Sequence, residues 1–474
     1  MYQSFIGLEI HIQLQTRTKI FCGCRAAYGD EPNTNVCPVC MGFPGVLPAL
    51  NGYAMELSYL VAEALHCQPS QVCSFDRKNY FYPDLPKNYQ ISQFASPVGT
   101  NGFIEYEHNN ELKKARIKEC HLEEDAGKMI HAGDMSLLDF NRTGTPLLEI
   151  VTEPDLTTGE EAEALLHQLR RTVRYLGVCD GNMDEGSMRC DANVSINLVG
   201  KGLGSKVEVK NLNSSKFVRK ALNYEIGRQE TVLTDGGQVA VETRLWNENR
   251  DVTEPMRSKE AANDYRYFPE PDLPPFRADE AFLQRVSQHM IELPLARRNR
   301  FISEYALSRV HADTISEEKS SADFFEAAVK LGASAQQTAS WFVSEIKKQL
   351  NQRAIDISEA KLKPEHITDI LARIEAGEIS GKIAKTVLSA VFDGEGAPAE
   401  IIAKRGLQQI TDPDQLIPVI NDVLAAHPQA VQEIADGGKK QIGFVVGQVM
   451  KKTGGKADPE LLHRLIAEQV AVAK

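Results

Sequence analysis

The hydrophobic pattern of this chain changes once, and the change divides the sequence into two kinds of structure. Before the change, apolar and polar residues alternate in short segments typical of half-buried β-strands, namely GLEIHIQL (7–14), RCDANVSINL (189–198), SKVEVKNL (205–212) and QVAVETRLW (238–246). The segment YFPEPDLPPF (267–276) holds four prolines, which argue against regular structure there. After it, apolar residues recur with the period of a helix, as in 280–305 and 321–332. The sequence therefore predicts an α+β fold, with a mostly antiparallel sheet followed by all-α domains.

A chain of 474 residues is too long for a single hydrophobic core. The proline-rich segment closes the first domain, and a second break, DGEGAPAE (393–400), precedes the last helical part. We therefore expect a first domain at 1–292, a helical domain at 293–400 and a helical tail at 401–474.

Charge and apolar content narrow the class of protein. The formal net charge of −12 argues against a general nucleic-acid coat, but 401–474 carries nine Lys and Arg against eight Asp and Glu. The tail is thus the part best able to approach a phosphate backbone. No apolar run approaches the roughly 18 residues of a membrane span, and the first residues lack the pattern of a signal peptide. We expect a cytoplasmic protein without a membrane segment.

Four of the nine cysteines form a cluster near the amino terminus. Cys22 and Cys24 lie in FCGC, and Cys37 and Cys40 lie in NVCPVCMG after twelve intervening residues. Disulfides are uncommon in a chain without an export signal, so the cluster indicates a metal or reactive thiols. Four thiolates suit tetrahedral zinc and leave no open position, which favours a structural zinc site over four free thiols.

A second candidate site combines carboxylates with a histidine. In GLEIHIQL the side chains of Glu9, His11 and Gln13 share one face of the expected strand, about 6.6 Å apart. A polar face in water would explain this segment equally well. Glu149 is harder to explain, because it lies within PLLEIV and an unpaired buried carboxylate is unfavourable. A Mg²⁺ ion shared with an acid of ECHLEEDAGK (119–128) would offset that penalty, since Mg²⁺ takes oxygen ligands.

Further polar segments could bind an anion. The start of the helix expected at 214–229 offers backbone amides beside a lysine, and other cations lie near aromatic residues. The candidate residues are Lys210, Asn211, Asn213 and Ser214 in KNLNSSKFVRK, Lys87 in FYPDLPKNYQISQ, and Arg266 in NDYRYFPEPDL. Serine and asparagine also cap helices, so a purely structural role is the alternative.

Seven motifs occur in an order that resembles one known family, the B subunit of the tRNA-dependent aspartyl/glutamyl amidotransferase. They are GLEIHIQL, FYPDLPKNYQISQ, HLEEDAGK, DFNRTGTPLLEIVTEPD, RCDANVSI, KNLNSSKFVRKALNYEI and ANDYRYFPEPDLPP. The resemblance implies an enzyme that binds tRNA misacylated with glutamate or aspartate and phosphorylates the side-chain carboxylate with ATP and Mg²⁺. It also implies a glutaminase A subunit that supplies ammonia and a small C subunit that completes a heterotrimer.

The resemblance also assigns residues. The family's metal site falls on Glu9, His11, Glu124 and Glu149, and its structural zinc site falls on the four cysteines. Glu124 is thereby expected to face the Mg²⁺ ion, with Lys87 and Arg266 as further catalytic residues. The residues expected near the nucleotide are Lys210, Asn211, Asn213 and Ser214. Two rival hypotheses are a zinc-containing RNA-binding scaffold without chemistry and a metallohydrolase that needs no ATP.

Overall fold

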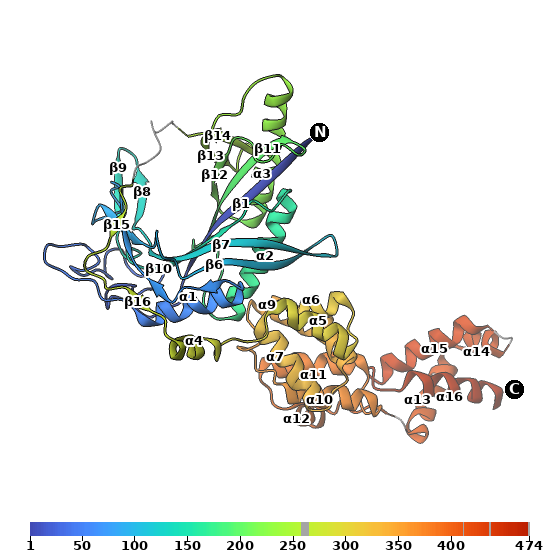
Figure 1. The fold of residues 1–474 in the computed structure, drawn as a ribbon. Helices are drawn as coiled ribbons and strands as arrows, with labels where there is room; N and C mark the ends of the chain where they lie inside the picture. The colour runs from blue at the N-terminus through green and yellow to red at the C-terminus, as the bar shows by residue number, and fades with distance from the viewer. Residues whose placement is uncertain (257–264, 411, 436–437, 473–474) are drawn as a thin grey trace. The chain divides into compact units, whose positions relative to one another are not determined.

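The computed structural model describes residues 1–256, 265–410, 412–435 and 438–472, and the chain divides into two compact units (Figure 1). The first unit is Met1–Leu295 and the second is Ala296–Lys474. Every strand of the described chain lies in the first unit, and the second is helical. The predicted α+β fold class is therefore confirmed.

A nine-stranded sheet forms the centre of the first unit, in the order β14-β13-β12-β11-β1-β10-β7-β6-β2. Its strands are β1 (Tyr2–Gln13), β2 (Gln68–Pro69), β6 (Gly99–His108), β7 (Glu111–Glu124), β10 (Pro146–Thr152), β11 (Met188–Leu198), β12 (Val207–Leu212), β13 (Glu242–Asn247) and β14 (Val252–Pro255). Neighbouring strands run antiparallel, except that β12 and β13 are parallel. All four segments predicted as strands contribute to this sheet.

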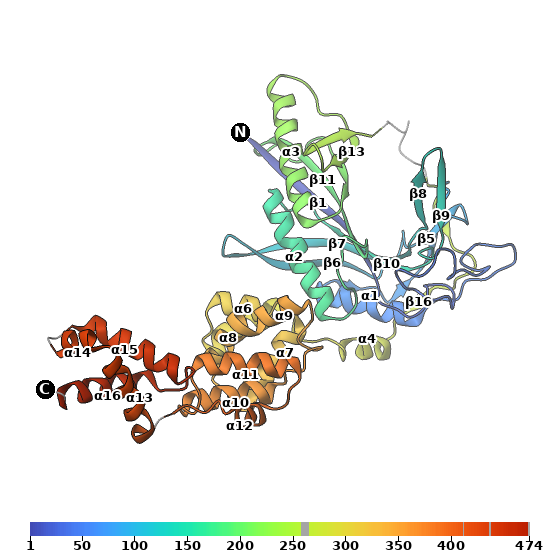
Figure 2. The ribbon, with the colours of Figure 1, turned by 180° about the vertical axis from the view of Figure 1, so that it is seen from behind.

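The two faces of the sheet differ because apolar and polar residues alternate along its strands. On β1 the residues of the apolar face are at most 1% exposed, namely Ile6, Leu8, Ile10 and Ile12. Three helices pack on that face and share its hydrophobic core, as Figure 2 shows for the second and third: α1 (Gly52–Ala64), α2 (Gly159–Tyr175) and α3 (Ser215–Thr234). The opposite face is polar, and it carries the candidate site.

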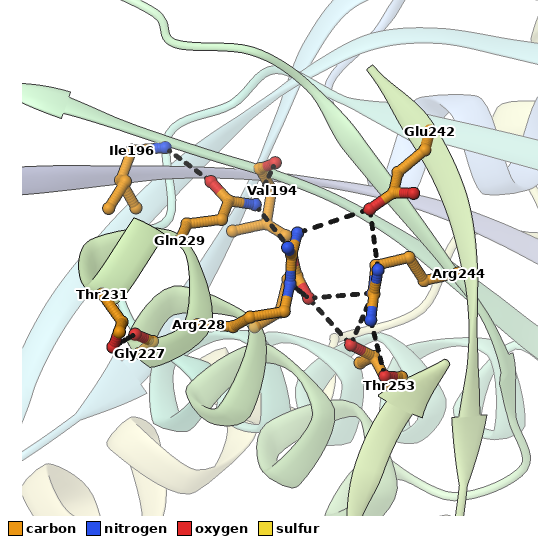
Figure 3. Close-up of polar contacts among 10 residues, drawn as sticks. Val194, Ile196, Gly227, Arg228, Gln229, Thr231, Glu242, Arg244 and Thr253 are labelled. Carbon is orange, nitrogen blue, oxygen red and sulfur yellow. Dashed lines mark hydrogen bonds and ion pairs between the residues drawn. The ribbon is translucent and has the colours of Figure 1, made fainter. Parts of the chain in front are cut away.

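A buried polar network fixes α3 on the sheet (Figure 3). Glu225 of α3 is fully buried. Its carboxylate accepts hydrogen bonds from Arg228, Gln229 and Thr253 at 2.5, 3.0 and 2.8 Å. The guanidinium of Arg244 on β13 donates to both the hydroxyl and the carbonyl of Thr253 on β14. These contacts join the helix to two strands through charges that are paired and hydrogen-bonded.

Short strands border the sheet. They form a three-stranded sheet of β15 (Phe268–Pro269), β4 (Asp76–Asn79) and β5 (Tyr89–Ser92), a pair of β16 (Phe276–Arg277) and β3 (Val72–Cys73), and a hairpin of β8 (Lys128–Ala132) and β9 (Met135–Asp139). The segment 267–276, expected to lack regular structure, thus takes part in two short strands. Pro269 is tolerated because β15 is an edge strand.

The helices after the sheet complete the fold. They are α4 (Glu280–Ser287), α5 (Pro294–Tyr305), α6 (Arg309–Ile315), α7 (Lys319–Lys330), α8 (Ala335–Trp341), the π-helical turn η1 (Phe342–Ile346), α9 (Lys347–Arg353), α10 (Pro364–Glu375), α11 (Gly381–Asp393), α12 (Pro398–Arg405), α13 (Pro413–Ala426), α14 (Pro428–Ala435), α15 (Lys439–Lys452) and α16 (Pro459–Val472). Among the described residues, no helix combines the length and apolar character needed to cross a membrane.

The second unit contains two separate hydrophobic clusters, one within 301–402 and the other within 416–470. The boundary predicted between 400 and 401 falls inside α12, whose Ile401 and Ile402 are buried in the first cluster. Leu407 also packs on that cluster. We therefore propose that the tail begins after Leu407.

Candidate functional site

Three strands bring a histidine and two carboxylates together on the polar face of the sheet. His11 of β1 lies opposite Glu149 of β10, which lies opposite His121 of β7. Glu123, two residues beyond His121, points to the same side of its strand. Nε2 of His11 lies 3.6 Å from Oε2 of Glu149 and 3.8 Å from Oε1 of Glu123. Ligand atoms of these three side chains lie within 4.8 Å of one another, a spacing at which they could hold a metal ion.

Glu123 is the acid of HLEEDAGK that lies in this cluster, and Glu124, the predicted ligand, lies outside it. The reason is the alternation of side chains along β7, which places Glu124 on the same face as the buried Leu122. The carboxylate of Glu124 pairs with the ammonium of Lys87 and accepts a hydrogen bond from the amide of Ile91 at 2.8 Å. The side chains of this ion pair are 3% and 8% exposed. Two residues predicted to act in catalysis therefore contact each other outside the cluster.

Two neighbours set the orientation and charge of the cluster. Nδ1 of His121 contacts the carbonyl of Gln93 at 2.9 Å. Its buried Nε2 lies 3.5 Å from Glu149 and has no hydrogen-bond partner in the part of the chain that the structure describes. Burial alone would lower the pKa of Lys78, but the carboxylates of Glu123 and Glu149 raise it. Burial raises the pKa of Glu123, and Glu149 raises it further. Two carboxylates thus face one lysine, and the remaining negative charge favours a bound cation.

Glu9, the fourth predicted ligand of that cation, lies in a different cluster. It is opposite Asp191 of β11, and its carboxylate lies within 4.8 Å of those of Asp191 and Glu208. Asn193 donates a hydrogen bond to Glu9 at 2.8 Å. The ammonium of Lys210, expected near the nucleotide, contacts Asp191 and Glu208 at 2.7 and 2.9 Å. Lys210 thus partly neutralises this second cluster.

The remaining predicted residues occupy separate positions. Asn211 has a φ of 67° where the register between β11 and β12 shifts, and its side-chain amide donates to a carbonyl of β13. Ser214 caps α3 by accepting a hydrogen bond from the amide three residues on, at 3.1 Å. Arg266 is exposed, and its carbonyl accepts a hydrogen bond from a side-chain amide of β4 at 2.8 Å. Residues 262–264 of the motif around Arg266 lie outside the described residues. The contacts of Asn211 and Ser214 in the structure are therefore of a purely structural kind, namely a hydrogen bond between strands and a helix cap.

The four cysteine sulfurs lie within 4.8 Å of one another. A tetrahedral zinc site with bonds of about 2.3 Å places its sulfurs about 3.8 Å apart, so the arrangement fits such an ion. The pKa of Cys40 is lowered to about 4, mainly by the thiol of Cys22, against the effect of burial and with smaller contributions from the amide of Cys37 and the ammonium of Lys19. The ammonium of the fully buried Lys19 lies 3.6 Å from the same sulfur. This surrounding favours a thiolate at Cys40.

A cavity of about 980 Å³ lies in the first unit, and its lining includes Gln13, Arg142, Arg189 and Asn213. Asp125, which is 3% exposed, accepts hydrogen bonds from Gln13 and Arg189 at 2.8 Å each. Nε of Arg142 lies 3.7 Å from the same carboxylate. Despite burial, these two guanidinium groups hold the pKa of Asp125 below its usual value.

Sequence reasoning does not identify Lys78, Arg142 or Arg189 as functional residues. Lys78 lies nine residues before Lys87, in the same aromatic-rich stretch, and that proximity is the one available signal. Arg189 begins a predicted strand and lies opposite His11, but this follows only after β1 is paired with β11.

The family models and the relatives that match this chain all point to the same family, and together they cover most of its length. Residues 4–284 match the family model described as the GatB/GatE catalytic domain, and residues 323–470 match the model described as the GatB domain. The chain is 47% identical over 476 residues to the B subunit of the aspartyl/glutamyl-tRNA(Asn/Gln) amidotransferase of Carboxydothermus hydrogenoformans, covering 99% of each chain. It is 48% identical over 486 residues to the protein of the same name from Synechocystis, covering 100% of this chain and 98% of that protein.

Proposed function

The chain belongs to the family of aspartyl/glutamyl-tRNA(Asn/Gln) amidotransferase B subunits, and from this membership we propose that it amidates Glu-tRNA(Gln), Asp-tRNA(Asn) or both in an ATP-dependent reaction. The products are Gln-tRNA(Gln) and Asn-tRNA(Asn). The activity is that of a carbon–nitrogen ligase that takes its nitrogen from glutamine.

The reaction needs two steps because a carboxylate is a poor acyl donor. First, the side-chain carboxylate attacks the γ-phosphorus of ATP, and the bond from that phosphorus to the bridging oxygen breaks as ADP leaves. Second, ammonia attacks the acyl carbon, the bond to the phosphate oxygen breaks, and the nitrogen loses a proton as inorganic phosphate leaves. Phosphoryl transfer of this kind depends on positioning and on neutralising charge.

Family membership carries this proposal, and the cluster of His11, Glu123 and Glu149 on the polar face of the sheet is the structural observation that supports it. These side chains would hold Mg²⁺, which prefers few protein ligands and keeps its other positions for water and phosphate oxygens. Mg²⁺ bound there would supply the positive charge that the transferring phosphoryl group requires. The carboxylates of this cluster raise the pKa of Lys78, and its ammonium is our candidate for a contact to the same phosphate.

Other predicted residues remain candidates for the path of ammonia or for contacts to the nucleotide and the acyl group. Lys87 pairs with Glu124, and this ion pair is our candidate for the path of ammonia. Lys210, Asn213 and Arg266 are candidates for contacts to the nucleotide or the acyl group, with Asn211 and Ser214 shaping the backbone near them.

The names of the relatives describe one component of a larger amidotransferase, so this chain should work with further subunits. We propose a glutaminase A subunit as the source of ammonia, a small C subunit as the third member of a heterotrimer, and misacylated tRNA as the substrate. The complex would act in the cytoplasm, where aminoacyl-tRNA is used.

ATP turnover that depends on misacylated tRNA tests this function. The reconstituted complex, given ATP, Mg²⁺ and glutamine, is expected to form ADP and amidated tRNA in equal amounts from Glu-tRNA(Gln) or Asp-tRNA(Asn). A zinc-containing RNA-binding scaffold would form no ADP. A metallohydrolase would lose activity to a chelator but would not require ATP.

Replacing Lys19 by methionine is expected to weaken zinc binding at the four cysteines about tenfold. Residues that contact the ligands of a metal typically contribute about 10–100-fold to its affinity. The tetrathiolate would lose the buried ammonium beside Cys40. Competition with a chromogenic chelator measures the apparent dissociation constant, with the exposed Lys201 replaced by methionine as the control. Equal zinc retention in the two variants would contradict a role for Lys19.

Ending the chain after Leu407 is expected to raise the KM for misacylated tRNA by about tenfold or more while changing the KM for ATP less than about twofold. Residues 408–474 carry seven Lys and Arg against eight Asp and Glu, a far smaller excess of negative charge than in 1–292, and contacts to phosphates dominate the affinity for nucleic acids. This end preserves α12 and its buried isoleucines. Steady-state kinetics on the reconstituted complex provide both constants, and a parallel rise in both would contradict a tRNA-binding tail.

A further inference from the structure

Beside the proposed cation site lies a second charged group of opposite sign. Asp125 shares its carboxylate between Arg142 and Arg189, so these three side chains together carry one positive charge. The carboxylates of Glu123 and Asp191 also act on Arg189. His11 and Arg189 are opposite each other on β1 and β11, so the positive group adjoins the negative cluster directly. The polar face thus carries a cation-binding cluster and an excess positive charge side by side.

Both arginines are held in place, yet both reach the large cavity. Arg142 donates to the carbonyls of Ala126 and Gly127 at 2.9 and 2.7 Å, and Arg189 donates to Asp125 at 2.8 Å. Nε of Arg189 is buried and, among the described residues, has no hydrogen-bond partner. The side chains remain 33% and 37% exposed, and both line the cavity of about 980 Å³. Positioned donors with spare capacity suit an incoming anion.

The charge balance selects the kind of anion. One excess positive charge matches a single carboxylate, whereas a polyphosphate carries several negative charges. Carboxylates elsewhere on the lining, including Asp139, Asp180 and Asp184, would repel a polyphosphate more strongly. The planar guanidinium fork also matches the two oxygens of a carboxylate.

We propose that Arg189, supported by Arg142, binds the side-chain carboxylate of the amino acid esterified to tRNA and presents it to the cation site. This inference rests on the proposed function and assigns a specificity residue within it. Arg189 would distinguish the acid of the substrate from the amide of the product, because the amide carries no charge to pair with the guanidinium.

Binding without ATP tests this assignment directly. The complex is titrated with one tRNA carrying glutamate, glutamine or no amino acid. With the unmodified chain, the glutamate form should bind more tightly than the glutamine form. Arg189→Gln should reduce that preference about tenfold or more, because a hydrogen bond to a charged group is lost. The affinities for the glutamine form and for the tRNA without an amino acid should not change. Arg189→Lys, which keeps the charge but loses the fork, should retain part of the preference.

Kinetics provide a second readout. Arg189→Gln should lower kcat/KM for Glu-tRNA about tenfold or more and change the KM for ATP less than about twofold. Arg250→Gln, which removes an exposed arginine paired with Glu254, is the matched control. An intact preference for glutamate in Arg189→Gln, or a KM for ATP that rises in parallel, would overturn the assignment alone. An unmodified complex without ATP-dependent amidation would overturn the proposed function together with it.

Discussion

Replacing Glu123 by glutamine is expected to lower ATP-dependent amidation by about 10³-fold or more, because a catalytic cation contributes several kcal/mol of charge stabilisation. The same change should raise the melting temperature of the metal-free chain. Glu123 is 4% exposed and lies close to Glu149, so glutamine removes a repulsion that no bound cation offsets. The stabilisation of the chain by added Mg²⁺ should also be lost, since a ligand stabilises a fold only through binding to it.

Amidation by the reconstituted complex and thermal melting with and without Mg²⁺ measure these effects. Glu119→Gln is the matched control, because Glu119 lies on the same strand and face and pairs with an exposed lysine. It should change neither activity nor the response to Mg²⁺. Full activity in Glu123→Gln, together with a loss of the Mg²⁺ response in Glu124→Gln, would restore Glu124 as the ligand.

Replacing Lys87 by methionine is expected to destabilise the first unit by about 3–5 kcal/mol, since it leaves the carboxylate of Glu124 buried without its cation. Adding Glu124→Gln should recover a large part of this loss, because the new side chain can still accept the hydrogen bond from the Ile91 amide. The resulting double-mutant cycle gives the coupling between the two side chains.

Tryptophan fluorescence during urea denaturation can report this unit alone. The chain has two tryptophans, so in a Trp341→Phe background the signal comes from the buried Trp246 of the first unit. Lys118→Met removes a lysine from the more exposed pair with Glu119 on the same strand, and it should change stability by less than about 1 kcal/mol. Equal effects of Lys87→Met and Lys118→Met would contradict the importance of burial.

Alternation along single strands predicted much of the fold and one side of the site. It separated the apolar face of β1 from Glu9 and His11, and the structure places those two residues on the polar face with Glu149. The same rule, applied to HLEED, separates Glu123 from Glu124 and Leu122, but it does not say which of the two acids faces the ion. The family resemblance assigned Glu124, whereas the structure places Glu123 beside His11.

Register between strands could not be predicted, and it decides which polar residues meet. Glu9 and His11 are neighbours on one face of β1, yet Glu9 lies opposite Asp191 while His11 lies opposite Glu149. One strand therefore contributes to two clusters. Lys78 lies on a separate small sheet, yet the carboxylates of the first cluster raise its pKa, an interaction that no periodicity within the chain encodes.

The network around Glu225 has a consequence for how this sequence can change. Each single replacement among Glu225, Arg228 and Arg244 leaves a buried or partly buried charge with fewer partners. Replacing all three together with apolar residues of similar size removes these charges at once and leaves only the more exposed Glu242. A lineage can pass between these two solutions only through less stable intermediates. Substitutions at these positions should therefore be found together in homologous sequences and seldom alone.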